Sequence, residues 1–180
     1  MKLYHGTTKF FSKGDILKTS NDATQGANTS FNAVYATSYM KLAVYYSLFP
    51  INHDSGARGL YTFGDDIVLV SKWHTGNYVY EVDSKDFSLL GKYIDGTGDE
   101  WVSSSNVKVI DSVEITPKIL ADCGYSVRIP KGGKFAKKII FRLAKSKLMS
   151  NLFFKDREKF NKYMNVLTVK YDREQHDSMS

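Results

Sequence analysis

Hydrophobic and polar positions alternate over short stretches in the first two thirds of the chain and recur with a helical period in the last third. Short runs rich in Val, Ile and aromatic residues, bounded by Gly, Asn, Asp or Ser, predict β-strands. The predicted strands are residues 1–5, 33–36, 67–70, 78–82 and 101–115. Since polar turn residues separate these runs, we expect a mostly antiparallel sheet.

One helix is predicted within this strand-rich part. Thr37 or Ser38 can cap its start, and Pro50 is expected to end it. Its apolar positions recur at helical spacing: Met40, Ala43, Val44 and Leu48. Residues 19–32 are polar and aperiodic, which predicts a loop between two strands. The order strand, loop, strand, helix, strands indicates an α+β domain.

The pattern changes after the breaker cluster Pro130-Lys131-Gly132-Gly133. Residues 134–149 predict one amphipathic helix, and a second helix is expected to start near Asp156 and to pack against the apolar face of the first. The apolar rows of the first helix are Phe135, Ile139 and Leu143, and Ala136, Ile140, Ala144 and Leu148. On the second helix they are Phe160, Tyr163, Met164 and Leu167. The tail from residue 173 is expected to fray.

Charge divides the chain near Thr116. The 180 residues include 25 basic and 19 acidic side chains. Residues 1–116 carry 10 basic and 13 acidic ones, net −3, and residues 117–180 carry 15 and 6, net +9. We therefore expect a core over 1–116 and a basic helical extension over 117–180. A split of this kind favours a polyanionic partner, nucleic acid or an anionic membrane surface, and the alternative is a solvated basic face.

Other classes of protein are disfavoured by composition. Cys123 is the single cysteine, so no internal disulfide or zinc ribbon can form. His53, His74 and His176 lack metal-ligand spacing, and no metal site is expected. No apolar run approaches the roughly 18 residues of a membrane span. These features predict a soluble, unexported, cytoplasmic protein.

Three short motifs follow one another in residues 1–116. Tyr4-His5-Gly6-Thr7 ends the first predicted strand, Val34-Tyr35-Ala36-Thr37 leads into the helix, and Asp99-Glu100-Trp101-Val102 opens a late strand. At these residues the sequence resembles the His-Tyr-Glu branch of the ADP-ribosyltransferase superfamily, which includes diphtheria-toxin-like and poly-ADP-ribose-polymerase-like domains. The opening LYHGTTKFFSKGDIL is also similar to that of bacterial rifamycin ADP-ribosyltransferases, whose third residue is Asp. The resemblance implies a compact split β-sheet ADP-ribosyltransferase fold for 1–116 and does not cover the last third.

The resemblance implies that NAD is the co-substrate and that Glu100 is the catalytic carboxylate. Breaking the bond between nicotinamide and ribose passes through an oxocarbenium-like sugar. A carboxylate that binds the ribose 2-hydroxyl and faces this charge stabilises the transition state more than the ground state. Asp99 competes with Glu100 for this role, and either can also be a solvated turn carboxylate.

By the same resemblance, His5 would bind the adenosine ribose, the Gly6 backbone would pair with the nicotinamide amide, and Thr7 would add a supporting hydrogen bond. A missing Cβ suits Gly6 to close backbone approach. The structural alternative for His5 is a turn residue that follows a strand.

Tyr35 would stack on the nicotinamide ring, and either Tyr45 or Tyr46 would close the other side. Spacing alone does not choose between these two. All three are also candidates for ordinary core or interface aromatics, since the chain has 12 tyrosines.

The acceptor of the ADP-ribose is predicted from what the motifs lack and from the basic extension. Superfamily members that modify arginine carry a second Glu two residues before the catalytic one. In this sequence that position is Gly98, so arginine is disfavoured as the acceptor. A core of about 116 residues has little room for the acceptor surface of chain-elongating members. Transfer of a single ADP-ribose is therefore favoured. Because the extension is basic, the favoured acceptor is nucleic acid, RNA or single-stranded DNA. The expected phosphate contacts are Lys137, Lys138, Arg142 and Lys145.

The leading interpretation is an intracellular toxin or defence effector, which implies a neutralising antitoxin or immunity partner. Two alternatives stay open. The acceptor can be a protein or a small molecule such as an antibiotic, although a small molecule leaves the basic extension unexplained. In a different class, the chain is a non-catalytic module that binds NAD or RNA, with the basic helix attached to RNA or to a membrane surface.

Overall fold

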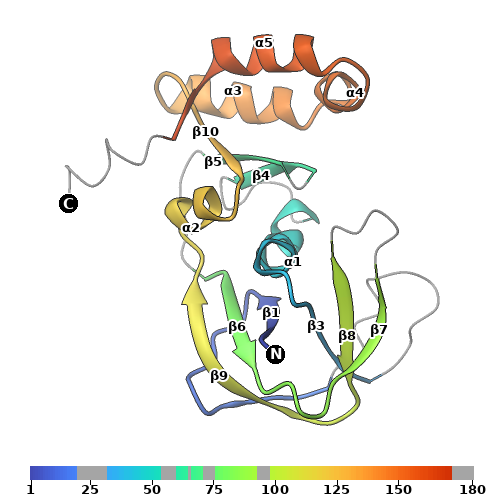
Figure 1. Ribbon diagram of the computed structural model, residues 1–180. Helices are drawn as coiled ribbons and strands as arrows, with labels where there is room; N and C mark the ends of the chain where they lie inside the picture. Colours follow the sequence, from blue (N-terminus) through green and yellow to red (C-terminus); the bar gives the residue numbers. More distant parts are fainter. Residues whose placement is uncertain (20–31, 54–59, 65, 71–75, 93–97, 172–180) are drawn as a thin grey trace. The chain divides into compact units, whose positions relative to one another are not determined.

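The structure, a computed structural model, describes residues 1–19, 32–53, 60–64, 66–70, 76–92 and 98–171. The expected loop at 19–32 and the tail from residue 173 lie almost wholly outside these ranges. The described residues form an α+β protein with three mostly antiparallel sheets and helices near the C-terminal end, which confirms the predicted class (Figure 1).

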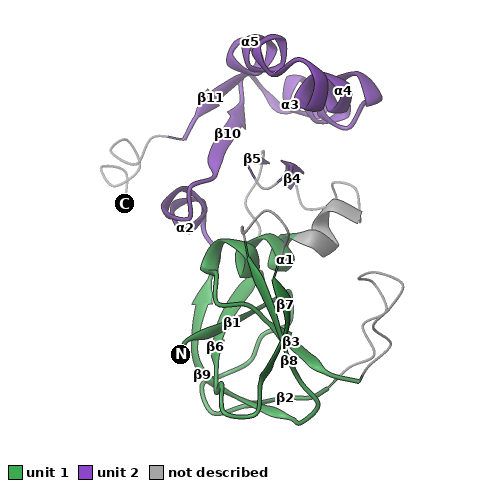
Figure 2. Cartoon of the chain, turned by 45° about the vertical axis from the view of Figure 1, so that its right-hand side comes forward, with its two compact units in different colours: residues 1–48, 76–115 green, residues 49–75, 116–180 purple. Residues whose placement is uncertain are grey.

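The chain divides into two compact units (Figure 2). Unit 1 comprises residues 1–48 and 76–115, and unit 2 comprises residues 49–75 and 116–180. The charge division near Thr116 predicts that residues 49–75 belong with the N-terminal part. In the structure this segment groups with the C-terminal residues because β5 (Ile67–Val70) pairs in parallel with β10 (Ser126–Pro130).

Unit 1 contains two antiparallel sheets. The first has the order β1-β6-β9-β2, with β1 Leu3–Thr7, β6 Tyr78–Val82, β9 Val107–Glu114 and β2 Ile16–Leu17. The second has the order β3-β8-β7, with β3 Val34–Ala36, β8 Asp99–Ser103 and β7 Ser88–Lys92. A bridge between Tyr4 and Thr37 connects them, through reciprocal backbone hydrogen bonds of 2.8 and 2.9 Å.

Side chains from both sheets form the core of unit 1. Its buried members are Leu3, Leu17, Val34, Ala36, Tyr80, Val82, Val107 and Val109. The Tyr80 hydroxyl accepts a hydrogen bond from the Phe11 amide (2.8 Å) and donates one to the Lys9 carbonyl (2.9 Å). A polar group buried this way is satisfied, and it fixes the segment that follows β1.

The predicted strand 101–115 is two strands in the structure. β8 ends at Ser103 and β9 begins at Val107. Between them the Ser103 hydroxyl accepts a hydrogen bond from the Ser105 amide and donates one to the Ser105 carbonyl, both at 3.2 Å. A serine side chain that bonds the backbone two residues on favours a turn over a continuous strand.

Helix α1 (Met40–His53) packs against β1 at a point where β1 has no side chain. A Cβ on Gly6 would lie 1.9 Å from the Ala43 carbonyl oxygen and 2.8 Å from the Ser47 amide nitrogen. The prediction that Pro50 ends this helix is wrong, because the helix continues to His53. A proline removes one backbone donor and disfavours a helix, but it does not forbid the turn that follows.

Unit 2 has a mixed four-stranded sheet with three helices packed against it. The sheet order is β11-β10-β5-β4, with β11 Thr168–Lys170 and β4 Leu60–Phe63. The helices are α3 Lys134–Ala144, α4 Lys147–Lys155 and α5 Arg157–Leu167, and the short α2 (Pro117–Asp122) precedes β10.

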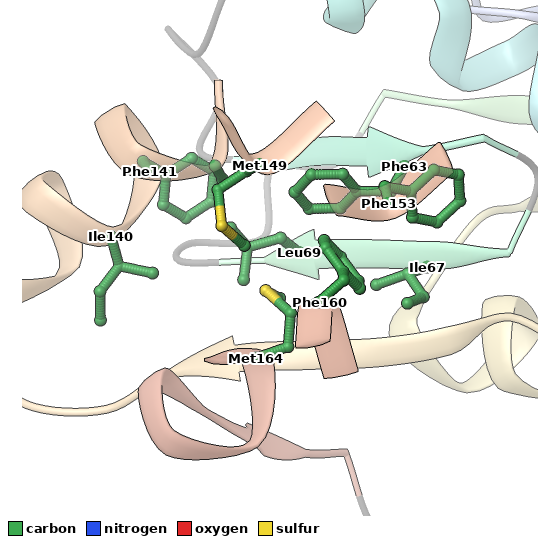
Figure 3. Close-up of a cluster of buried hydrophobic side chains, with 10 residues drawn as sticks. Phe63, Ile67, Leu69, Ile140, Phe141, Met149, Phe153, Phe160 and Met164 are labelled. Atoms are coloured by element: carbon green, nitrogen blue, oxygen red, sulfur yellow. The ribbon is translucent and has the colours of Figure 1, made fainter. Parts of the chain in front are cut away.

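Figure 3 shows the core of unit 2, in which the three helices pack onto β4 and β5. Phe63, Phe153 and Phe160 form a cluster of rings whose centroids lie 4.9–5.7 Å apart. Such tilted and edge-to-face pairs add stability beyond the area that they bury. The remaining buried members are Ile67, Leu69, Ile140, Phe141, Ala144, Met149 and Met164.

The prediction of one continuous helix over 134–149 is wrong, because the structure has two helices in this range. The Ser146 hydroxyl accepts a hydrogen bond from the Met149 amide and so caps α4, and α3 ends at Ala144. The predicted apolar rows are buried only in part: Phe135 is 78% and Ile139 49% exposed, whereas Leu143 of the same row packs against the core, and Leu148 of the other row is 61% exposed. The predicted helix near Asp156 is confirmed as α5, with Asp156 as its N-cap.

Gly6→Ala tests the close packing of β1 on α1. The new methyl group would meet backbone atoms that cannot rotate away, so we expect a loss of stability of about 1–3 kcal/mol or more. Thermal unfolding measures it. Gly91→Ala is the matched control, since it is also in a strand and its added Cβ has nothing within 4 Å. Equal melting temperatures for the two variants would contradict this packing.

Candidate functional site

His5 and Tyr35, from two separate motifs, are in direct contact in unit 1. The His5 Nδ1 atom lies 2.7 Å from the backbone carbonyl oxygen of Tyr35. A carbonyl oxygen can only accept, so Nδ1 carries a proton in this contact, and in the neutral tautomer that has this proton Nε2 is an acceptor. The bond forms because the bridge between Tyr4 and Thr37 holds β1 beside β3.

Asp99, the first residue of β8, is a buried structural carboxylate. It accepts hydrogen bonds from the Thr37 hydroxyl (3.1 Å), the Ser38 amide (2.7 Å) and the Ser38 hydroxyl (2.7 Å). Burial raises the pKa of Asp99, but these hydrogen bonds outweigh it and lower the pKa below its usual value. The buried indole nitrogen of Trp101 has no hydrogen-bond partner among the described residues.

Glu100, the next residue, is in the opposite situation. It is half-buried, and within the described part of the chain its carboxylate has no hydrogen-bond or salt-bridge partner. Burial alone raises the pKa of Glu100 above its usual value. Successive residues of a strand point to opposite faces, so Asp99 and Glu100 cannot share one environment.

The pairing of β3 with β8 brings Glu100 to the same face as Tyr35. Tyr35 pairs with Val102, and Ala36 pairs with Trp101. Ala36 and Trp101 belong to the core, so Tyr35, Val102 and Glu100 lie on the other face of the sheet. Glu100 is a diagonal neighbour of Tyr35, a relation in which Cα atoms lie about 7–8 Å apart.

Gly6 and Thr7 have structural roles that account for these residue types without a bound ligand. Gly6 is the point of closest approach between β1 and α1. The Thr7 hydroxyl accepts a hydrogen bond from the Lys9 amide at 3.2 Å, so it stabilises the turn after β1.

Tyr45 and Tyr46 lie side by side on α1, both half-buried, with ring centroids 6.0 Å apart in an edge-to-face arrangement. The fully buried positions around them are Ala43, Val44, Ser47 and Leu48. The choice between the two tyrosines as a nicotinamide neighbour stays open.

The four predicted phosphate contacts belong to unit 2 and differ in exposure. Lys138 and Arg142 are exposed, whereas Lys137 and Lys145 are half-buried. Burial lowers the pKa of Lys145. Lys134, which is not among the four predicted contacts, is exposed and lies four residues before Lys138.

The sequence pattern does not predict the roles of Asp99 and Ser38. It indicates Ser38 only as a helix cap and Asp99 only as an alternative to Glu100. The two are 61 positions apart in the sequence, and no local pattern connects them.

No protein-family model matches the chain, and no curated protein matches its sequence. Among the described residues, no helix has the length and apolar character to cross a membrane. Nor do three or more His, Cys, Asp or Glu residues of that part come together as a metal site.

Asp99→Asn tests the structural role of the buried carboxylate. The amide cannot accept from all three donors, so we expect a loss of about 1–3 kcal/mol at neutral pH. The pKa of Asp99 is held below its ordinary 3.8, so the unfolded chain binds the proton more readily and the stabilisation is lost as the pH falls through the folded pKa. Unfolding experiments should therefore find the gap between variant and parent narrowing on acidification.

The substitution at the neighbouring residue, Glu100→Gln, should have the opposite effect on stability. A carboxylate whose pKa is raised above its ordinary 4.5 makes the folded state less stable as the pH rises through the folded pKa, and the amide removes this effect. We expect Glu100→Gln to be at least as stable as the parent at neutral pH. If both amide variants are destabilised alike, the distinction drawn between the two carboxylates is wrong.

Proposed function

We propose that unit 1 is a mono-ADP-ribosyltransferase that transfers ADP-ribose from NAD to a macromolecule, with nucleic acid, RNA or single-stranded DNA, as the acceptor. The observation that carries the proposal is the contrast between adjacent carboxylates. Asp99 is fully used in hydrogen bonds to Thr37 and Ser38, whereas the half-buried Glu100 has no partner among the described residues and lies on the face of Tyr35.

The chemistry requires a carboxylate of this kind. The bond between ribose C1′ and the nicotinamide nitrogen breaks, its electron pair leaves with neutral nicotinamide, and positive charge develops on the sugar. The Glu100 carboxylate binds the ribose 2-hydroxyl and opposes that charge. Its effect is larger in a poorly hydrated environment, where water screens the charge less. The acceptor nucleophile then bonds to C1′ and gives up its proton to water.

The other residues are proposed to hold NAD. The Nε2 atom of His5 accepts from a hydroxyl of the adenosine ribose, and the hydrogen bond to the Tyr35 carbonyl fixes the ring for this contact. The Tyr35 ring stacks on nicotinamide. The Gly6 backbone pairs with the nicotinamide amide, Thr7 supports it, and Tyr45 or Tyr46 lies on the far side of the ring.

Nucleic acid is the proposed acceptor because of the charge of residues 117–180, which carry net +9. Lysine and arginine contacts to phosphates supply affinity that is independent of sequence and depends on salt. An intracellular toxin or defence role, with a neutralising antitoxin or immunity partner, fits an enzyme of this kind in the cytoplasm.

The competing class is a non-catalytic module that binds NAD or RNA. Incubation of the protein with NAD distinguishes the two. Release of nicotinamide supports the transferase, and NAD that stays intact while it binds supports the module. Label from NAD that appears only on protein, or on a small molecule such as an antibiotic, would replace nucleic acid as the acceptor.

Glu100→Gln should abolish most turnover. The amide keeps the size and the hydrogen bonding but removes the charge that opposes the oxocarbenium, so nicotinamide release should fall about 100- to 1,000-fold, or about 3–4 kcal/mol. NAD binding, measured by calorimetry, should survive. Unchanged turnover would remove Glu100 from the catalytic role.

His5→Ala and Tyr35→Ala should act mainly on NAD binding, because both residues are proposed to position the substrate. Calorimetry should therefore find a higher dissociation constant for each variant. Lys85→Ala, an exposed change in unit 1, is the control for general effects. Normal NAD affinity in both variants, with normal turnover, would contradict the proposed His-Tyr-Glu site.

A further inference from the structure

The face of α3 that unit 2 leaves exposed carries two parallel rows of side chains. Its buried face contributes Ile140, Phe141 and Ala144 to the core. The exposed residues form a cationic row of Lys134, Lys138 and Arg142 and an apolar row of Phe135 and Ile139. Residues four apart in a helix lie one above the other, so the rows run side by side along the helix.

The apolar row is unusual in its exposure. Phe135 is 78% and Ile139 49% exposed, although both belong to the pattern that predicted a buried stripe. Apolar side chains that are scattered singly on a surface need no explanation. Here two of them lie one helical turn apart beside three cations, and no acidic residue occurs from Lys131 to Ser150.

We propose that this face binds a single-stranded nucleic acid, with phosphates along Lys134, Lys138 and Arg142 and an unpaired base stacked on Phe135. The inference rests on the proposed function for the class of its acceptor. It changes the interface expected from the sequence, because the half-buried Lys137 and Lys145 are replaced by the exposed Lys134 and the apolar row.

The spacing of the cations favours a strand of nucleic acid as the occupant. Residues four apart rise about 6 Å along a helix. This is comparable with the separation of successive phosphates in an extended single strand. The second row then lies where the bases of such a strand would be. In a duplex the base faces are stacked on each other, and Phe135 has no surface to meet.

A fluorescein-labelled oligouridine, tested by fluorescence anisotropy with the full chain and no NAD, measures this binding. Phe135→Ala should weaken binding about 5- to 150-fold, the equivalent of the 1–3 kcal/mol that a stacked base contributes. Phe154→Ala is the matched control, because this phenylalanine on α4 is 76% exposed and lies outside the two rows. An equal loss in both variants would overturn the stacking role of Phe135.

Salt dependence tests the cationic row. Changing Lys134, Lys138 and Arg142 together to Gln should lower the slope of log affinity against log salt by about 2, since each phosphate contact on a single strand contributes about 0.7. The charge-matched control changes Lys118, Lys159 and Lys170, which are exposed on α2, α5 and β11. An equal effect of the two triple variants would mean that binding depends on non-specific electrostatic attraction, and would overturn the proposed phosphate contacts of the cationic row.

Two further measurements complete the test. The oligonucleotide annealed to its complement should bind more weakly than the single strand, and vesicles of phosphatidylcholine and phosphatidylserine should not capture the protein. Tight duplex binding, or binding to vesicles without binding to oligouridine, would overturn the proposal. Nicotinamide release is assayed separately without oligonucleotide. Binding without cleavage contradicts only the transferase, and cleavage without binding contradicts only this interface.

Discussion

The buried carboxylate of Asp99 is the interaction on which the candidate site depends. Its two oxygens take three hydrogen bonds from Thr37 and Ser38, and so tie the start of β8 to the turn between β3 and α1. The same turn is joined to β1 through the bridge between Tyr4 and Thr37. The carboxylate therefore joins β8 to this turn, and backbone pairing joins the turn to β1. Each of the three segments carries one motif of the proposed His-Tyr-Glu site.

Successive side chains of a strand point to opposite faces, so the two neighbouring carboxylates lie in different environments. Asp99 points to donors that stabilise its charge, and Glu100 points to the face of Tyr35, where burial disfavours its charge. A carboxylate that is costly to hold ionised contributes little to folding. Groups of this kind are candidates for function because their properties suit chemistry better than stability.

Unit 2 has a similar division between packing and exposure. The ring cluster of Phe63, Phe153 and Phe160 fills its core, and a cation contact from Arg157, 3.9 Å above the Phe153 ring, adds to it. Helix α3 covers this core with Ile140, Phe141 and Ala144, and Leu143 packs against it. Phe135 and Ile139 of the same helix are left at the surface among basic residues, which is where the proposed nucleic-acid interface lies.

Periodicity and turn residues determined much of the local structure from the sequence alone. The strands at 67–70 and 78–82 and the helix after Asp156 follow from β-branched runs and an N-cap, since such signals act within a few residues. The ends of helices were predicted less well: Ser146 caps a new helix within the long predicted one, and α1 continues beyond Pro50. The motifs around His5, Tyr35 and Glu100 were visible, but their contacts were not. Tertiary structure alone decided that Asp99 bonds Ser38, that Gly6 meets Ala43, and that Phe135 stays exposed. Each depends on segments brought together by folding, and no local pattern encodes which face of an element will find a partner.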